Sequence, residues 1–389
     1  MVVHLVSIIK VTTGEMGMMG LGIGKILLEK REEKGITQDV LANFIGVSKA
    51  SISKWETGKT YPDITLLPKL AAFYNMTVDE LIGYTPQLTK EEIKKQYHEL
   101  ATQFSKQDFQ LVYEHSQSIS QKYYACLPLL LQLGILYLNH YMLAPTEEKQ
   151  QVVLAETAQL FARIKQESDD VWLNKQANSL QAVVYLLLKE PEKILALLGD
   201  TLQPAVGDEM VLSNAFQMMG DIEQAKRTLQ VNMYQSLLNM VGTAHSYILL
   251  TVDKVEEFEE TIHRMEGVTS LFGLKELHPT IVLQFYYAAA QGYAMQENRE
   301  KTLYWLEQYV AVCTSVIFPI TLHGDDFFTL IDAWLEDLDL GIKAVRDDEM
   351  IKESMLQSVC AQPAFTFVQD DPFFKVLIEN LKFSLGGNK

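Results

Sequence analysis

The chain has 389 residues and a formal net charge of −17, too long for one domain and acidic enough to argue against nucleic-acid binding by the chain as a whole. Its three cysteines, Cys126, Cys313 and Cys360, lie far apart, which offers neither a disulfide framework nor a zinc pattern and suits a reducing, cytoplasmic setting. No apolar run reaches transmembrane length, so no membrane contact is expected.

Residues 1–19 are expected to lie outside the folded part, as an extended or disordered segment. Their apolar patch lacks the basic leader of a secretory signal. The glycine-rich stretch of residues 17–25 does not fit a phosphate loop, because Met19 and Ile26 stand where that loop needs a glycine and a hydroxyl residue. It does not fit a dinucleotide fingerprint either, since Lys25 takes the place of the third glycine. We therefore expect a flexible entry into the first helix.

A short helix and a turn are predicted after Thr37. Val40, Leu41 and Phe44 recur at a spacing of three to four, so we expect them to form the buried face of this helix. Gly46 is expected to end it, because the left-handed conformation at a helix C-terminus costs glycine least.

A second helix is predicted to begin just after Ser48, whose hydroxyl can accept a hydrogen bond from a free N–H group. Only Ile52 and Trp55 are expected to point inward from it. Its open side then carries the small, polar and basic residues Lys49, Ala50, Ser51, Ser53 and Lys54. A helix with one narrow apolar seam and such an open face can lie in the major groove of DNA.

This stretch resembles the lambda-repressor-like helix-turn-helix of the Xre family of bacterial and phage regulators. The resemblance covers roughly residues 22–84 and is carried by motifs in a fixed order. These are Thr37-Gln38, Gly46-Val47-Ser48, Ile52-Ser53-Lys54-Trp55-Glu56, Gly58-Lys59, Tyr61-Pro62-Asp63, and Val78-Asp79-Glu80-Leu81-Ile82-Gly83. It implies a head of five helices over residues 20–84 that binds double-stranded DNA.

The resemblance also implies roles for single residues. Gln38 would touch both a phosphate and a base edge, while Thr37 and Lys59 would hold phosphates. Arg31 and Glu56 would form an ion pair between the first helix and the motif. The implied set of DNA-contacting residues is Thr37, Gln38, Ser48, Lys49, Ala50, Ser51, Lys54 and Lys59.

The charge is unevenly divided between the head and the rest of the chain. Residues 20–85 contain 8 Lys and Arg against 8 Asp and Glu, so the remaining 25 basic and 42 acidic residues carry the whole charge of −17. Such a body repels DNA and would confine binding to the head, where Lys49, Lys54 and Lys59 gather positive charge.

The body is predicted to be helical throughout residues 90–389, after a linker at residues 85–89. Thr89-Lys90-Glu91-Glu92 reads as a capping box that opens its first helix. From there apolar residues recur at three and four, with short Pro, Gly and Asp breaks, and about fifteen helices are expected.

Degenerate tetratricopeptide-like repeats are predicted within this body, so the fold class is all-α with an α-superhelical body. Such a repeat needs a small residue, an aromatic residue three later, a small or apolar one nine beyond and a bulky one four further. The matching sets are Ser213, Phe216, Ala225 and Leu229; Ala290, Tyr293, Thr302 and Leu306; Ala182, Tyr185, Ile194 and Leu198; and the half-match Gly134 and Tyr137. An irregular helical bundle remains the alternative.

The combination of such a head with such a body resembles the peptide-sensing regulators grouped as the RRNPP family. That resemblance implies a homodimer, an inverted-repeat operator and a signalling peptide held in the concavity of the body. Side-chain amides that can both donate and accept are suited to a peptide backbone. The candidates are Asn139, Asn178, Asn214, Gln217 and Gln291.

Other functions remain open for the same body, which could instead scaffold a partner protein or respond to a small molecule. The eight histidines show no metal-ligand spacing, and no nucleophile–base motif appears, so neither a metal, a cofactor nor an enzymatic activity is expected. The favoured hypothesis is a sequence-specific transcriptional regulator.

Overall fold

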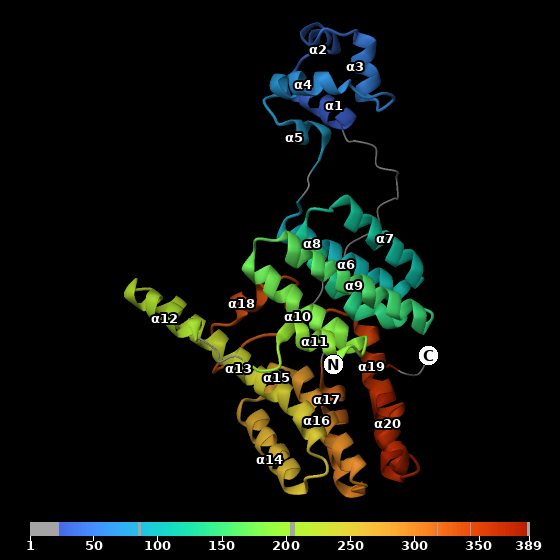
Figure 1. Cartoon of the computed structure of the whole chain (residues 1–389), viewed down its shortest axis with the longest axis vertical. Coiled ribbons are helices and arrows are strands. Elements are labelled where there is room, and N and C mark those ends of the chain that lie inside the picture. The colour runs from blue at the N-terminus through green and yellow to red at the C-terminus, as the bar shows by residue number, and fades with distance from the viewer. Residues whose placement is uncertain (1–22, 85–86, 203–206, 317, 343, 387–389) are drawn as a thin grey trace. The chain divides into compact units, whose positions relative to one another are not determined.

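The computed structural model describes residues 23–84, 87–202, 207–316, 318–342 and 344–386 (Figure 1). Within these ranges the regular elements are α-helices and short 3-10 helices, which confirms the predicted all-α class. Chain contacts divide the protein into two compact units. One contains the described residues up to 89 together with residues 118–129, and the other contains residues 90–117 and everything described after residue 129.

The head is a bundle of five α-helices, as the sequence predicted. They are α1 (Ile23–Glu33), α2 (Gln38–Ile45), α3 (Lys49–Glu56), α4 (Leu67–Tyr74) and α5 (Val78–Ile82), with a 3-10 turn η1 (Ile64–Leu66) before α4. Each helix contributes one completely buried aliphatic side chain to a common core: Leu27, Leu41, Ile52, Leu70 and Leu81. Burying one such side chain stabilises a fold by about 1.5–3 kcal/mol, so this cluster holds the five helices together.

The helix ends in the head follow the expected capping chemistry. Gly46 ends α2 in the left-handed conformation with φ of 90°, and its N–H donates to the carbonyl of Ala42. The hydroxyl of Ser48 accepts from the N–H of Ser51 and starts α3. Both signals were read correctly from the sequence because caps depend on adjacent residues only.

The predicted buried face of α2 was partly wrong. Leu41 is buried together with Ala42 and Ile45, whereas Val40 and Phe44 are each about half exposed. Two stripes of this eight-residue helix have the same four-residue spacing, and only one can face the core. The ring of Phe44 instead packs beside that of Phe73, with 4.5 Å between ring centroids.

Fifteen α-helices follow residue 89 in the described chain, which agrees with the predicted number. They are α6 (Lys90–Lys106), α7 (Phe109–Lys122), α8 (Leu127–His140), α9 (Glu147–Glu167), α10 (Val171–Leu187), α11 (Pro191–Leu198), α12 (Asp208–Met218), α13 (Ile222–Leu250), α14 (Val255–Leu271), α15 (Leu274–Leu277), α16 (Pro279–Met295), α17 (Arg299–Ser315), α18 (Asp332–Glu336), α19 (Asp348–Cys360) and α20 (Pro372–Ser384). Two 3-10 helices, η2 (Tyr141–Leu143) and η3 (Pro363–Val368), accompany them. No helix in the described ranges is both long and apolar enough to cross a membrane.

Helical hairpins occur where the repeat pattern predicted them. α12 and α13 form one, in which the hydroxyl of Ser213 donates to the carbonyl of Ala225 at 3.2 Å. α16 and α17 form another, with Ala290 and Thr302 completely buried between them. The pair α10 and α11 is looser, since Leu198 is 52% exposed. The hairpins are therefore real but unequal, as expected of degenerate repeats.

Two glycines allow helices of the body to approach closely. A Cβ atom at Gly134 of α8 would lie 2.5 Å from the ring of Phe161 on α9. A Cβ atom at Gly292 of α16 would lie 2.4 Å from the ring of Phe258 on α14. In both places the aromatic ring occupies the space that a side chain would need, so the crossing depends on glycine. Figure 1 shows α16 with its neighbouring helices α14 and α17.

Candidate DNA-binding site

The helix α3 is fixed to the head along one side and open along the other. Ile52 and Trp55 are buried, as predicted, but Glu56 is buried as well, at 8% exposure. On the opposite side Lys49, Ala50 and Lys54 are exposed. The prediction that only two residues of this helix point inward was therefore wrong, because Glu56 is a third. A buried carboxylate requires a partner.

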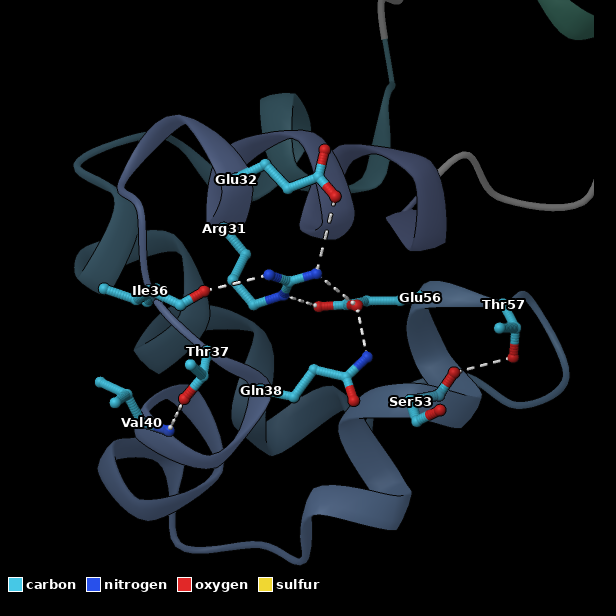
Figure 2. Close-up of polar contacts among 9 residues, drawn as sticks. All are labelled: Arg31, Glu32, Ile36, Thr37, Gln38, Val40, Ser53, Glu56 and Thr57. Atoms are coloured by element: carbon cyan, nitrogen blue, oxygen red, sulfur yellow. Dashed lines mark hydrogen bonds and ion pairs between the residues drawn. The ribbon is translucent and has the colours of Figure 1, made fainter.

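That partner is Arg31 on α1, which confirms the predicted ion pair (Figure 2). Its Nε lies 2.6 Å from Glu56 Oε1 and its Nη2 lies 3.1 Å from Glu56 Oε2, a two-pronged contact. The third nitrogen, Nη1, donates to the carbonyl of Ile36 at 3.0 Å. The hydrogen bond to Glu56 raises the pKa of Arg31 above its ordinary value. This pair ties α1 and the start of α2 to the end of α3.

Tyr74 of α4 lies in the same electrostatic environment. Burial, with a smaller contribution from the negative charge of Glu56, raises the pKa of Tyr74 to about 12. The phenol therefore stays neutral at every physiological pH.

Gln38 begins α2, where a contact with both a phosphate and a base edge is implied. Its amide nitrogen Nε2 donates to Glu56 Oε2 at 2.8 Å, which fixes the side chain against the end of α3 (Figure 2). Thr37 precedes it and caps α2, accepting from the N–H of Val40 at 3.4 Å. The amide oxygen of Gln38 and the hydroxyl hydrogen of Thr37 are not used in these bonds, so both residues remain candidates for contact with DNA.

The first turn of α3 carries the other predicted contacts. Lys49 pairs with Asp39 of α2, with 2.7 Å between Nζ and Oδ2, and both side chains are more than half exposed. An exposed pair of this kind contributes little to stability, so little free energy is lost when Lys49 exchanges the aspartate for another partner. The hydroxyls of Ser48 and Ser51 lie 2.9 Å apart beside it.

Lys54 and Lys59 flank the far end of α3. The N–H of Lys59 donates to the carbonyl of Lys54 at 2.9 Å, so the two residues are joined through the backbone. Both side chains are exposed, and neither has an ion-pair partner among the described residues. The eight predicted contact residues thus lie on α3, its two ends and the start of α2, and the structure brings them to one region of the head.

Gly24 is part of α1 and buried, so the expectation of a flexible entry was wrong at this position. A Cβ atom there would lie 2.4 Å from the carbonyl oxygen of Trp55. The glycine that suggested a phosphate loop is therefore needed for close packing between α1 and the end of α3. The rest of the glycine-rich stretch, up to residue 22, lies outside the described residues.

The five residues proposed to hold a peptide are not gathered in one place. Gln291 lines a cavity of the body, which the other four do not. The amide of Asn139 donates to the carbonyl of Ile135 on its own helix, and the Asn178 oxygen accepts from Lys165. Asn214 and Gln217 are exposed on α12.

Two features of these sites were missed from sequence alone. These are the restraint of Lys49 by Asp39 and the restraint of Gln38 by Glu56. The partners are 10 and 18 residues apart and lie on separate helices, α2 and α3. Such separations carry no local signal, because only the fold brings these helices together.

Residues 27–81 match the family model HTH_3, described as Helix-turn-helix. This segment is therefore an Xre-like helix-turn-helix domain, the class of DNA-binding fold that its five helices define. Over 66 residues the chain is 39% identical to the HTH-type transcriptional activator BcrR of Enterococcus faecalis. That alignment covers 17% of this chain and 32% of BcrR, so the chain spans about a third of the length of this relative.

Two solved structures resemble the chain over most of its length at low identity. The apo form of the competence regulator ComR from Streptococcus vestibularis is 12% identical, with a TM-score of 0.26, over 76% of this chain and 93% of that one. PlcR of Bacillus thuringiensis, in complex with the peptide PapR7 and DNA, is 15% identical, with a TM-score of 0.27, over 75% and 94%. The domain assignment rests on the family match of residues 27–81.

Proposed function

We propose that this protein is a sequence-specific DNA-binding transcriptional regulator, with no enzymatic role, in which α3 reads base edges in the major groove. The observation that carries the proposal is the two-sided character of α3. Ile52, Trp55 and Glu56 fix one side to the head, while Ala50 and Lys54 stay exposed on the other. A recognition helix that reads bases must be held firmly by its domain and must expose small and basic side chains to the major groove.

Affinity in this proposal comes from phosphate contacts and discrimination from base contacts. Thr37 and Lys59 supply the former at the two ends of the motif. Base contacts come from Lys49, Ala50, Ser51 and Lys54, and a lysine can donate to the O6 and N7 atoms of guanine. The acidic body adds no favourable charge, so DNA meets the head alone.

The proposal includes a homodimer. Its two heads would bind the two halves of an inverted repeat, with centres about 34–36 Å apart or a multiple of that.

The surface we assign to a second copy of the chain is the exposed apolar part of α12, where Val211 is 69% and Met218 is 89% exposed. Sedimentation of the full chain at micromolar concentration should show a dimer, and Val211→Glu with Met218→Glu should shift it to monomer. A monomeric wild-type chain would contradict this part.

The body is proposed to sense a short peptide and so to change how the two heads bind DNA. A ligand acts only if it binds one arrangement better than the other, since equal affinity shifts nothing. Support comes from a cavity in the body that Gln291 lines.

The test of the regulator itself is immunoprecipitation of the tagged protein from its own cells, followed by sequencing of the bound DNA. We expect a shared inverted repeat near a limited set of promoters. Binding spread over the genome without a common sequence would contradict the proposal.

A further inference from the structure

A cavity of about 380 Å³ lies within the body among α13, α16, α17 and α19. α16 directs Gln284, Tyr287 and Gln291 into it, and these residues share one face because they lie three and four positions apart. Leu249 of α13 and Met355 of α19 add apolar surface. A mostly apolar space of this size with a few polar groups has the character of a small-ligand pocket.

Arg346, in the segment before α19, also lines this cavity. Its Nε donates to the carbonyl oxygen of Asn139 at 3.0 Å, and its Nη2 lies 3.8 Å from the sulfur of Met142. Both partners are neutral. Burial lowers the pKa of Arg346 below its ordinary value, which marks a guanidinium partly withdrawn from water.

The other arginines of the chain are all paired with acids. Arg31, Arg163, Arg227, Arg264 and Arg299 each lie within 4.0 Å of an Asp or Glu oxygen. Among the described residues, no carboxylate lies within that distance of Arg346. Among the described residues, Arg346 is thus the only arginine without a carboxylate at ion-pair distance.

The acidic residues that follow Arg346 are used elsewhere. Asp347 caps α19, accepting from the N–H of Glu349 at 3.1 Å. Glu349 lies 2.8 Å from Lys352. An uncompensated, half-buried cation costs free energy that an anionic ligand would recover.

We propose that this cavity binds a ligand through a free carboxylate paired with Arg346. The planar guanidinium can bind a carboxylate through two parallel hydrogen bonds. The contacts with Asn139 and Met142 use Nε and Nη2, which leaves the Nη1 donors for the ligand. Gln284 and Gln291 lie about 10 Å apart along α16, the length of about three extended residues. Their amides can bond the polar backbone of the ligand while Leu249 and Met355 contact its apolar part.

This inference rests on the proposed sensing function and specifies the ligand. The C-terminus of a short peptide and a small carboxylic acid share the required chemistry, and the experiment separates them. The full-length protein is equilibrated with a random heptapeptide library made in two forms, one with free C-terminal acids and one with amides. In parallel, its thermal unfolding is followed with hexanoate and with hexanamide.

Three variants complete the experiment. Arg346→Gln removes the charge at similar size, and Arg346→Lys keeps the charge without the planar fork in case the first variant does not fold. Arg299→Gln, an exposed arginine paired with Asp371, is the matched control.

We expect the wild type and Arg299→Gln to retain free-acid peptides roughly tenfold or more over amides, and Arg346→Gln to lose this preference. Arg346→Lys should fall between them. Stabilisation by hexanoate alone, dependent on Arg346 and without peptide retention, would uphold the carboxylate site and overturn peptide sensing. Equal retention of acids and amides would uphold peptide sensing and overturn the carboxylate site. No binding of either probe would overturn the inference as well.

Discussion

Arg31 and Glu56, 25 residues apart in sequence, are joined by two contacts of 2.6 and 3.1 Å, with side-chain exposures of 13% and 2%. Removing one partner leaves the other charge buried without compensation. We therefore predict that Arg31→Ala destabilises the head by about 3 kcal/mol, which speeds amide exchange in α1 and α3 roughly hundredfold. Hydrogen–deuterium exchange of the full chain measures this segment by segment.

The control for this prediction is Arg264→Ala, which breaks an exposed pair with Glu260. Such pairs are worth about 0–1 kcal/mol, so little change is expected in α14. If the two variants behaved alike, the Arg31–Glu56 pair would not be holding α3 in place.

Gly24→Ala is predicted to destabilise the protein by about 1–3 kcal/mol, because the added Cβ would meet the carbonyl of Trp55 at 2.4 Å. Gly267→Ala, in the middle of α14, has open space at its Cβ and is expected to stabilise by about 0.5–1 kcal/mol. Thermal unfolding of the two variants compares them directly. A neutral Gly24→Ala would show that α1 can move away from α3 at no cost.

The five helices of the head and their caps were predictable, because the buried Leu41 and Ile52 and the caps Gly46 and Ser48 follow from neighbouring residues. The exposure of Val40 and Phe44 was not, since two stripes of α2 have equal spacing and the packing of α2 against the rest of the head decides between them. The role of Gly24 depends on a backbone 31 positions away. That of Arg346 depends on Asn139, 207 positions away.

Acid is predicted to destabilise the body through two buried histidines. Burial lowers the pKa of both His140 and His278 from 6.5 to about 4. Between these values the unfolded chain binds more protons than the folded one, so the stability present above pH 6.5 is lost as the pH falls. The slope is about 1.4 kcal/mol per pH unit for each histidine.

The variants that test this keep the local packing. His140→Phe preserves the stacking of His140 on Phe104, and His278→Asn preserves a cap on α16. Urea unfolding between pH 5 and 7 should show a flatter pH dependence in the double variant, while His323→Gln, at an exposed site, should follow the wild type. An unchanged profile in the double variant would assign the acid sensitivity to other groups.

Lys59 is predicted to hold a phosphate. Lys59→Ala should weaken binding to the best operator and to random DNA by the same factor. It should also reduce the slope of log affinity against log salt by about 0.9. Titrations of DNA with protein between 50 and 200 mM salt measure this slope. Lys30→Ala on α1 is the control for the loss of one positive charge. A change in base preference would instead place Lys59 at a base edge.

Base reading by α3 is tested by the ratio of the affinities for the best operator and for a scrambled duplex. We expect Lys54→Ala to lower this ratio roughly tenfold, which is about 1.4 kcal/mol and lies within the 1–3 kcal/mol of one good base contact. Lys30→Ala should leave the ratio unchanged. If the Lys54→Ala protein discriminated between the two duplexes as well as the wild type, α3 would not read base edges through Lys54.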